Sequence, residues 1–282
     1  MPIDAGSGER RAGIRIRGGA SLVSCLTVTR ECRLASLRLA LGDYRRQTHT
    51  DRELVIVHDG SAAFHDRVEA VARSNGQSDV TVHRASQGLT LGQLRNIAVG
   101  LAAGTYVCQW DDDDRYHPRR LEVQLQALRA DDGDFCFLTD QLHLFADTGT
   151  LYWDDWTDEI PPLDVVQGTL LGRTDKLPAY PALGRGEDTA VVRELVALGH
   201  RVTRLHEHGY LYAYVFDGGN VWDYGHHSAI SARKRLRGAR LLRRISVLKQ
   251  RLAEYDPPLP ALTMPCELGA LVVDPANDVK RA

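Results

Sequence analysis

The chain has 282 residues, and its 35 Lys and Arg against 37 Asp and Glu give a formal net charge of −2. With 43% hydrophobic and 26% charged residues, the composition is that of an ordinary globular protein, which excludes a largely disordered or fibrous chain. No stretch approaches the roughly 20 consecutive apolar residues of a membrane-spanning helix, so we expect a cytoplasmic protein. The five cysteines are scattered and form no Cys-x-x-Cys pair, which predicts buried thiols in a reducing compartment.

The first half of the chain alternates between strand and helix patterns. Residues 1–20 are rich in Gly and Arg and are expected to form a mobile leader, with ordered structure from Ser21. Four apolar runs of strand length follow, separated by segments of helical periodicity. The runs are residues 22–28, 54–57, 80–83 and 106–110. This alternation predicts a largely parallel sheet flanked by helices, whose ligands bind beyond the carboxyl ends of the strands.

The second half is less regular. Pro118 is predicted to open a helix at its first position, and residues 135–138 resemble a further strand. Another helix is expected to start at Glu187 and Asp188 and to stop at Gly199. Strands are predicted at residues 202–205 and 211–215.

A cluster of four carboxylates, Asp111 to Asp114, follows the fourth predicted strand and is the strongest chemical signal. Adjacent carboxylates repel one another, so such a cluster needs a compensating cation. Hard oxygen ligands of this kind suit Mg²⁺ or Mn²⁺ bound together with a phosphate. The alternative is an acidic loop that caps the helix beginning near Pro118.

Five motifs in a fixed order resemble family two of the glycosyltransferases over about residues 21 to 130. They are Val28-Thr29-Arg30, Val55 to Ser61, Leu94-Arg95-Asn96-Ile97-Ala98, Ala103-Gly104-Thr105-Tyr106, and Asp111 to Asp114 with Pro118. The resemblance implies a GT-A fold, an α/β architecture with a Rossmann-like, mostly parallel sheet flanked by helices. It divides a domain of residues 21–230 into a nucleotide-sugar-binding half, 21–115, and an acceptor-binding half, 116–230, followed by a basic helix and tail, 231–282.

The activity that the resemblance implies is inverting transfer of a sugar, in the hexosyltransferase class. The donor would be a nucleoside diphosphate sugar, with a UDP-sugar favoured, and the cofactor Mn²⁺ or Mg²⁺. The acceptor hydroxyl could belong to a saccharide, a lipid-linked molecule, a peptide or a small molecule, and no nucleic acid is expected. A non-catalytic nucleotide-sugar- or carbohydrate-binding protein of the same fold is the alternative.

The resemblance also assigns roles in donor binding. Asp113 would be the direct metal ligand, and Asp111 would lie nearer the ribose while sharing the metal. Asp59 would accept a hydrogen bond from a uracil-type N–H, unless it only forms a turn before Gly60 or His58 replaces it. Arg95 would clamp the donor, its alternative being an ion pair with the acidic cluster. Thr29 and Asp112 complete the expected donor site, although Asp112 and Asp114 could instead cap the next helix.

The general base is expected in the pair Glu187 and Asp188, with Asp188 as the base and Glu187 as its positioner or substitute. Plain capping of the helix is the alternative. Arg185 could assist the diphosphate. Downstream, His226 and, less favoured, His227 could supply a third metal ligand or contact the acceptor.

The segment from Arg233 to Arg251 holds nine basic residues and no acidic one, which leaves about −11 for the rest of the chain. This asymmetry argues against a general nucleic-acid binder. Apolar residues from Leu236 to Leu252 are spaced for one face of a helix. That helix could dock on the domain with a solvated basic face, or lie on the inner face of an anionic membrane near a lipid-linked acceptor.

Overall fold

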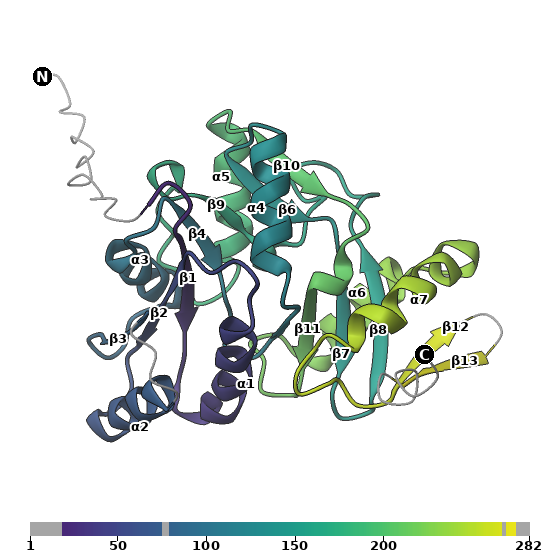
Figure 1. The fold of residues 1–282 in the computed structure, drawn as a ribbon, viewed down its shortest axis with the longest axis horizontal. Coiled ribbons are helices and arrows are strands. Elements are labelled where there is room, and N and C mark those ends of the chain that lie inside the picture. The colour runs from purple at the N-terminus through teal and green to yellow at the C-terminus, as the bar shows by residue number, and fades with distance from the viewer. Residues whose placement is uncertain (1–18, 75–78, 267–268, 275–282) are drawn as a thin grey trace, which may run out of the picture.

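The computed structural model describes residues 19–74, 79–266 and 269–274, so the expected leader lies almost wholly outside the described residues. Two sheets with their helices lie side by side (Figure 1). Within the described residues, no helix is both long and apolar enough to cross a membrane.

The first sheet has seven strands in the order β10-β6-β9-β4-β1-β2-β3. Strand β1 pairs in parallel with β2 and β4, and β2 pairs in parallel with β3, whereas β9 is antiparallel to both of its neighbours. The strands are β1 (Val23–Val28), β2 (Arg52–His58), β3 (Val80–Arg84), β4 (Tyr106–Gln109), β6 (Phe135–Leu138), β9 (Leu171–Arg173) and β10 (Val202–Leu205). The mostly parallel sheet predicted from the sequence is confirmed.

Helices cover both faces of this sheet, because alternate side chains of each strand point to opposite faces. Cys25 and Ile56 pack in one core cluster with α1 (Leu34–Arg45), α2 (Ala62–Arg73) and α4 (Arg120–Ala130). Leu26 and Val57 pack in a second cluster with α3 (Leu91–Leu101) and α5 (Glu187–Ala197). Short 3-10 turns lie at η1 (Glu31–Arg33), η2 (Gln167–Thr169), η3 (Thr174–Lys176) and η4 (Gly209–Leu211).

The second sheet is mixed, with six strands in the order β13-β12-β8-β7-β11-β5. It contains β5 (Arg115–Tyr116), β7 (Asp140–Phe145), β8 (Thr150–Asp155), β11 (Tyr212–Phe216), β12 (Leu262–Cys266) and β13 (Gly269–Val273). Helices α6 (Tyr224–Lys234) and α7 (Gly238–Leu252) pack beside it (Figure 1). The tail therefore adds two strands to the second sheet, and the predicted boundary at residue 230 falls within α6.

Three local expectations differ from the structure. Helix α4 begins at Arg120, so Pro118 precedes it instead of taking its first position. The basic segment is divided between the end of α6 and α7, and α7 docks on the domain by burying Leu241, Leu248 and Leu252. Of the cysteines, Cys32 is exposed, whereas Cys25, Cys108 and Cys136 are buried as expected.

Glycine in α3 is required at one position and not at another. The Gly92 N–H donates to the Leu183 carbonyl at 3.0 Å, and a Cβ at Gly92 would lie 1.8 Å from the Pro181 carbonyl oxygen. A Cβ at Gly100 would meet nothing within 4 Å. The close approach at Gly92 holds the loop that leads into α5 against α3.

We therefore expect Gly92→Ala to lower the free energy of unfolding by about 1–3 kcal/mol, because the loop must move away from the added methyl group. Gly100→Ala is the matched control and should raise that free energy by up to about 1 kcal/mol, because Ala favours the helix over Gly. Chemical denaturation of both variants measures the difference. Equal stabilities would show that the loop yields without cost.

Candidate functional site

A pocket of about 420 Å³ lies beyond the carboxyl ends of β1, β2 and β4, where the first sheet meets β7 and β11 of the second. Every site residue predicted from the sequence lines it. These are Thr29, Asp59, Arg95, Asp111, Asp112, Asp113, Glu187, Asp188 and His226. The fold thus gathers segments that lie nearly 200 positions apart in the sequence.

Three of the four clustered carboxylates are held by protein donors. Asp111 accepts hydrogen bonds from Arg95 Nη2 at 2.9 Å and from Gln109 Nε2 at 2.7 Å. Asp114 accepts from the Tyr212 hydroxyl at 2.5 Å and from the backbone N–H of Val215 at 3.0 Å. Because Tyr212 and Val215 belong to β11, Asp114 ties the first sheet to the second.

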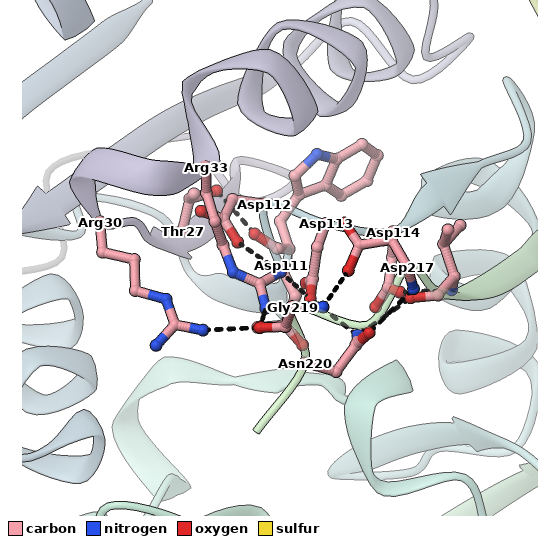
Figure 2. A network of polar contacts seen from close by, with 12 residues as sticks. Thr27, Arg30, Arg33, Asp111, Asp112, Asp113, Asp114, Asp217, Gly219 and Asn220 are labelled. Carbon is pink, nitrogen blue, oxygen red and sulfur yellow. Dashed lines mark hydrogen bonds and ion pairs between the residues drawn. The ribbon is translucent and has the colours of Figure 1, made fainter. Parts of the chain in front are cut away.

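Asp113 is bound from two other elements. Its Oδ2 forms an ion pair with Arg33 of η1 and accepts a hydrogen bond from Asn220 Nδ2 at 3.2 Å (Figure 2). Asn220 also donates to the Val215 carbonyl at 3.0 Å, which fixes the loop after β11. The residue predicted to bind the metal is therefore paired with a guanidinium.

Asp112 is the least satisfied member of the cluster. It is 4% exposed, its Oδ2 makes no hydrogen bond to any described residue, and its Oδ1 lies 3.8 Å from Arg33 Nη1. Burial and the neighbouring charge of Asp113 raise the pKa of Asp112 to about 8. An orphaned, buried carboxylate oxygen is a place where a cation would be favourable.

Arg95 joins the acidic cluster to the start of α5. It is 6% exposed, donates from Nε to Glu187 Oε1 at 2.9 Å, and pairs through Nη2 with Asp111 at 2.9 Å. The ion pair that the sequence left open as an alternative role is thus present. Arg95 brings the cluster and the Glu187-Asp188 pair within the span of one guanidinium.

Asp188 differs from Glu187 in its partners. Its Oδ1 accepts from the backbone N–H of Thr189 at 2.6 Å, and no Lys, Arg or His among the described residues lies within 4 Å of its carboxylate oxygens. Burial raises the pKa of Asp188 above its usual value. The positive charge of Arg95 lowers that pKa, but by less than burial raises it. Gly186, with φ of 74°, is the left-handed residue at which α5 begins.

The two residues at the end of β2, His58 and Asp59, differ in whether they face the pocket. Asp59 lines the pocket and accepts from the Gly88 N–H at 3.2 Å. His58 is fully buried, faces His65 with 3.1 Å between Nε2 and Nδ1, and does not line the pocket. Burial lowers the pKa of His58 to about 4, so it is neutral near pH 7, and of these two residues only Asp59 faces the pocket.

His226 lies at the pocket rim. Its ring stacks on Trp222 with centroids 4.4 Å apart, and the Arg185 guanidinium lies 4.5 Å from the Trp222 ring centroid. No group of three or more His, Cys, Asp or Glu side chains is gathered as a ligand set in the described part of the chain. His226 as a third ligand therefore remains a prediction.

The pocket lining nevertheless has more carboxyl groups than guanidiniums. Seven carboxylates face it, those of Asp59, Asp111, Asp112, Asp113, Asp114, Glu187 and Asp188. Four guanidiniums face it, those of Arg30, Arg33, Arg95 and Arg185. The oxygen donors, the orphaned Asp112 oxygen and this imbalance fit a divalent cation.

Sequence reasoning missed several residues of the site. Arg33, Asn220 and Tyr212 hold the acidic cluster, and His143 lines the pocket from β7 with Asp154 3.0 Å from its Nδ1. Arg33 could have been noticed as a charged residue just beyond the first strand. No local pattern marks the others, because each acts through a partner far away in the sequence.

The pKa of Asp112 predicts a pH-dependent effect on stability. A carboxyl group whose pKa rises on folding binds its proton more tightly in the folded state, so the folded state loses stability as pH rises from about 4 to about 8. Asp112→Asn removes this loss. We expect the variant to unfold at a higher temperature than the wild type at pH 8, with the difference nearly gone at pH 4.5, in thermal denaturation without added metal. A difference independent of pH would contradict the assignment.

Comparison with known proteins gives a consistent picture. Residues 24–148 match the model of the family "Glycosyl transferase family 2". The Bacillus subtilis (strain 168) protein "Putative glycosyltransferase EpsH" is 33% identical over 114 residues, which are 40% of this chain and 32% of that protein. The Escherichia coli (strain K12) protein "Putative colanic acid biosynthesis glycosyl transferase WcaA" is 28% identical over 142 residues, 50% of this chain and 43% of that one. The chain thus spans less than half the length of these relatives.

Among solved structures, S. aureus TarS 1–349 in complex with UDP-GlcNAc superposes with a TM-score of 0.57 at 16% identity, covering 83% of this chain and 67% of that one. The same protein in complex with UDP gives a TM-score of 0.54 at 14% identity, covering 84% and 72%. At this identity the likeness establishes the fold. The family match is a separate finding, and the residues that it covers include Thr29, Asp59, Arg95 and the acidic cluster.

Proposed function

We propose that the protein is an inverting glycosyltransferase that moves a sugar from a nucleoside diphosphate, with UDP favoured, to an acceptor hydroxyl. The observation that carries this proposal is the bridge through Arg95, which links the acidic cluster to the Glu187-Asp188 pair inside one pocket. Sugar transfer needs both a site for a diphosphate and a base within reach of the acceptor. The structural neighbour TarS, solved with UDP-GlcNAc and with UDP, supports a uridine nucleotide.

The donor would bind against the carboxyl ends of the first sheet. Asp59 would accept a hydrogen bond from the base, and Asp111 would lie near the ribose. Thr29 is 3% exposed and lines the pocket, where its hydroxyl lies near the carboxyl group of Asp112 and could also contact the donor. This placement follows the general rule for ligands at parallel strand ends.

A divalent cation, Mn²⁺ or Mg²⁺, would be held by Asp113 and Asp111, with His226 as a third candidate ligand. When bound, such an ion supplies positive charge that stabilises the departing diphosphate. The chain's own share of this task falls to Arg185 and to the guanidiniums after β1.

Asp188 is the general base in this proposal, because its carboxylate is free of the ion pair that occupies Glu187. It takes the proton of the acceptor hydroxyl as that oxygen attacks the anomeric carbon. The bond from this carbon to the diphosphate oxygen breaks, the electron pair leaves with the diphosphate, and the configuration inverts. Glu187 holds Arg95 in place and thereby positions the start of α5.

The acceptor would enter from the half formed by residues 116–230, which lines the pocket with Tyr214, Trp156 and His143. Helix α7 turns Leu241 and Leu248 into the core, so any contact with an anionic membrane surface would use its outward basic side chains together with Leu242 and Val247. We propose such a peripheral contact only for a lipid-linked acceptor.

A donor screen tests the proposal. Purified protein is incubated with UDP-, GDP- and dTDP-sugars, with Mn²⁺ or with EDTA, and the free nucleoside diphosphate is measured. We expect release of UDP with Mn²⁺, loss of release with EDTA, and recovery on adding Mn²⁺ or Mg²⁺. Binding of a nucleotide sugar without any release would instead support a non-catalytic binding protein.

Asp188→Asn keeps the shape of the side chain but cannot take a proton. We expect transfer to fall by roughly 10² to 10⁴ while donor affinity stays within a few-fold of the wild type. Turnover measured as released nucleoside diphosphate, and donor binding by calorimetry, separate the two effects.

Glu187→Gln is the matched control, because it removes the charge opposite Arg95 and leaves Asp188 intact. We expect a smaller loss of turnover than for Asp188→Asn. If Glu187→Gln were the more damaging and Asp188→Asn were fully active, the base would be Glu187. Two fully active variants would show that the pair only starts the helix.

A further inference from the structure

Arg33 is a buried cation of the pocket that belongs to none of the five motifs found in the sequence. It lies in η1, directly after β1, and is 7% exposed. Its Nη1 pairs with Asp113, and its Nη2 donates to the carbonyl oxygen of Gly219 at 2.6 Å (Figure 2). One guanidinium thus connects the acidic cluster with the loop after β11.

The oxygen of Asp113 that Arg33 holds is the same one that Asn220 binds, namely Oδ2. A metal ion coming to this oxygen would meet a positive charge already in contact with it. Two cations on one carboxylate oxygen repel each other. A metal ion can therefore bind Asp113 only if Arg33 moves away, or if both cations share the carboxylate and their repulsion weakens metal binding.

A second guanidinium converges on the loop. Arg30 Nη2 donates to the Gly219 carbonyl at 2.8 Å, so two positive charges point at one neutral oxygen. Because this carbonyl oxygen is uncharged, it neutralises neither the Arg30 nor the Arg33 guanidinium. A guanidinium forms its strongest contacts with a phosphate or a carboxylate, to which it can donate two parallel hydrogen bonds.

Arg95 is not free to serve the same purpose. Its Nη2 is bound to Asp111 and its Nε to Glu187, whose side chain is 3% accessible and would be left as an uncompensated buried charge if Arg95 turned away. Arg33 is different, because Asp113 would gain the metal in exchange for the guanidinium.

We propose that Arg33 is an exchangeable cation of the donor site, which neutralises Asp113 in the empty pocket and moves to a phosphate oxygen of the donor when a metal ion binds Asp113. This inference rests on the proposed function and deepens it by assigning a diphosphate-binding residue. No covalent bond changes in the exchange. The carboxylate passes from one cation to another, and the released guanidinium meets the anion that arrives with the metal.

The exchange predicts effects of opposite sign on two ligands. Removing the guanidinium in Arg33→Met removes the competitor for Asp113, so Mn²⁺ alone should bind about tenfold more tightly than to the wild type. The same change removes a contact to phosphate, so UDP in the presence of saturating Mn²⁺ should bind about tenfold more weakly. A residue that merely supports the fold would shift both affinities in the same direction.

Titration calorimetry with Mn²⁺ alone, and with UDP at saturating Mn²⁺, measures both affinities on the full chain. Arg38→Met is the matched control, because Arg38 is an exposed residue of α1 that does not line the pocket, and it should change neither affinity. Arg33→Lys provides a second variant if Arg33→Met folds poorly. A lysine keeps the charge opposite Asp113 and loses the planar fork, so Mn²⁺ affinity should stay within about threefold of the wild type while UDP binding weakens.

Arg33→Met binding both ligands more weakly, or both as the wild type does, would overturn the proposal. Asp113→Asn should abolish the gain in Mn²⁺ affinity in the Arg33→Met background, and a persistent gain would also overturn it. Failure of the proposed function has a separate signature, in which the wild type binds no nucleoside diphosphate under any condition. The Mn²⁺ titration still decides the role of Arg33 in that case, since Arg33→Met should then bind Mn²⁺ more tightly than the wild type.

Discussion

The crowding of seven carboxyl groups around one pocket is the constraint that organises this site. Asp111, Asp113 and Asp114 each accept a hydrogen bond from a residue of a different element, and these elements pack on both sheets. Arg95 reaches Asp111 from α3, Arg33 reaches Asp113 from η1, and Tyr212 reaches Asp114 from β11. The contacts that neutralise the cluster are therefore the same contacts that join the two halves of the domain.

The cluster rests on a rigid aromatic layer. Trp110, the residue before Asp111, stacks on Tyr116 with centroids 3.9 Å apart, and the buried guanidinium of Arg120 lies 4.8 Å from the Tyr116 centroid and 5.4 Å from that of Tyr212. Arg120 Nε donates to Gln124 at 3.0 Å, whereas Nη1 and Nη2 find no hydrogen-bond partner among the described residues. Attraction between this cation and the surrounding ring faces compensates in part.

Much of the fold could be predicted from the sequence because its first half is built from local patterns. The apolar runs at residues 54–57 and 80–83 became β2 and β3, and the polar residues after the strands met at one edge, as parallel pairing requires. The hairpin of β7 and β8 was not predicted, since its strands carry charged and polar residues at both ends. Contacts such as Arg33 with Asp113, 80 positions apart, and Asn220 with Asp113, 107 positions apart, depend on the assembled fold and leave no local pattern.

The balance of charges also limits what can enter the pocket. A nucleoside diphosphate is itself an anion, so the ionised carboxylates of the pocket would repel it unless positive charge is available at its phosphates. Arg95 cannot supply that charge, because it is buried between Asp111 and Glu187 and already neutralised by both. Asp113 is more exposed than Glu187, with side chains 17% and 3% accessible, and the other partner of Arg33 is a neutral carbonyl. The site therefore combines Arg95, which is fixed by the buried Glu187, with Arg33, whose partners can be replaced. Of these two guanidiniums, only Arg33 can move to the anion of a ligand that also brings a cation.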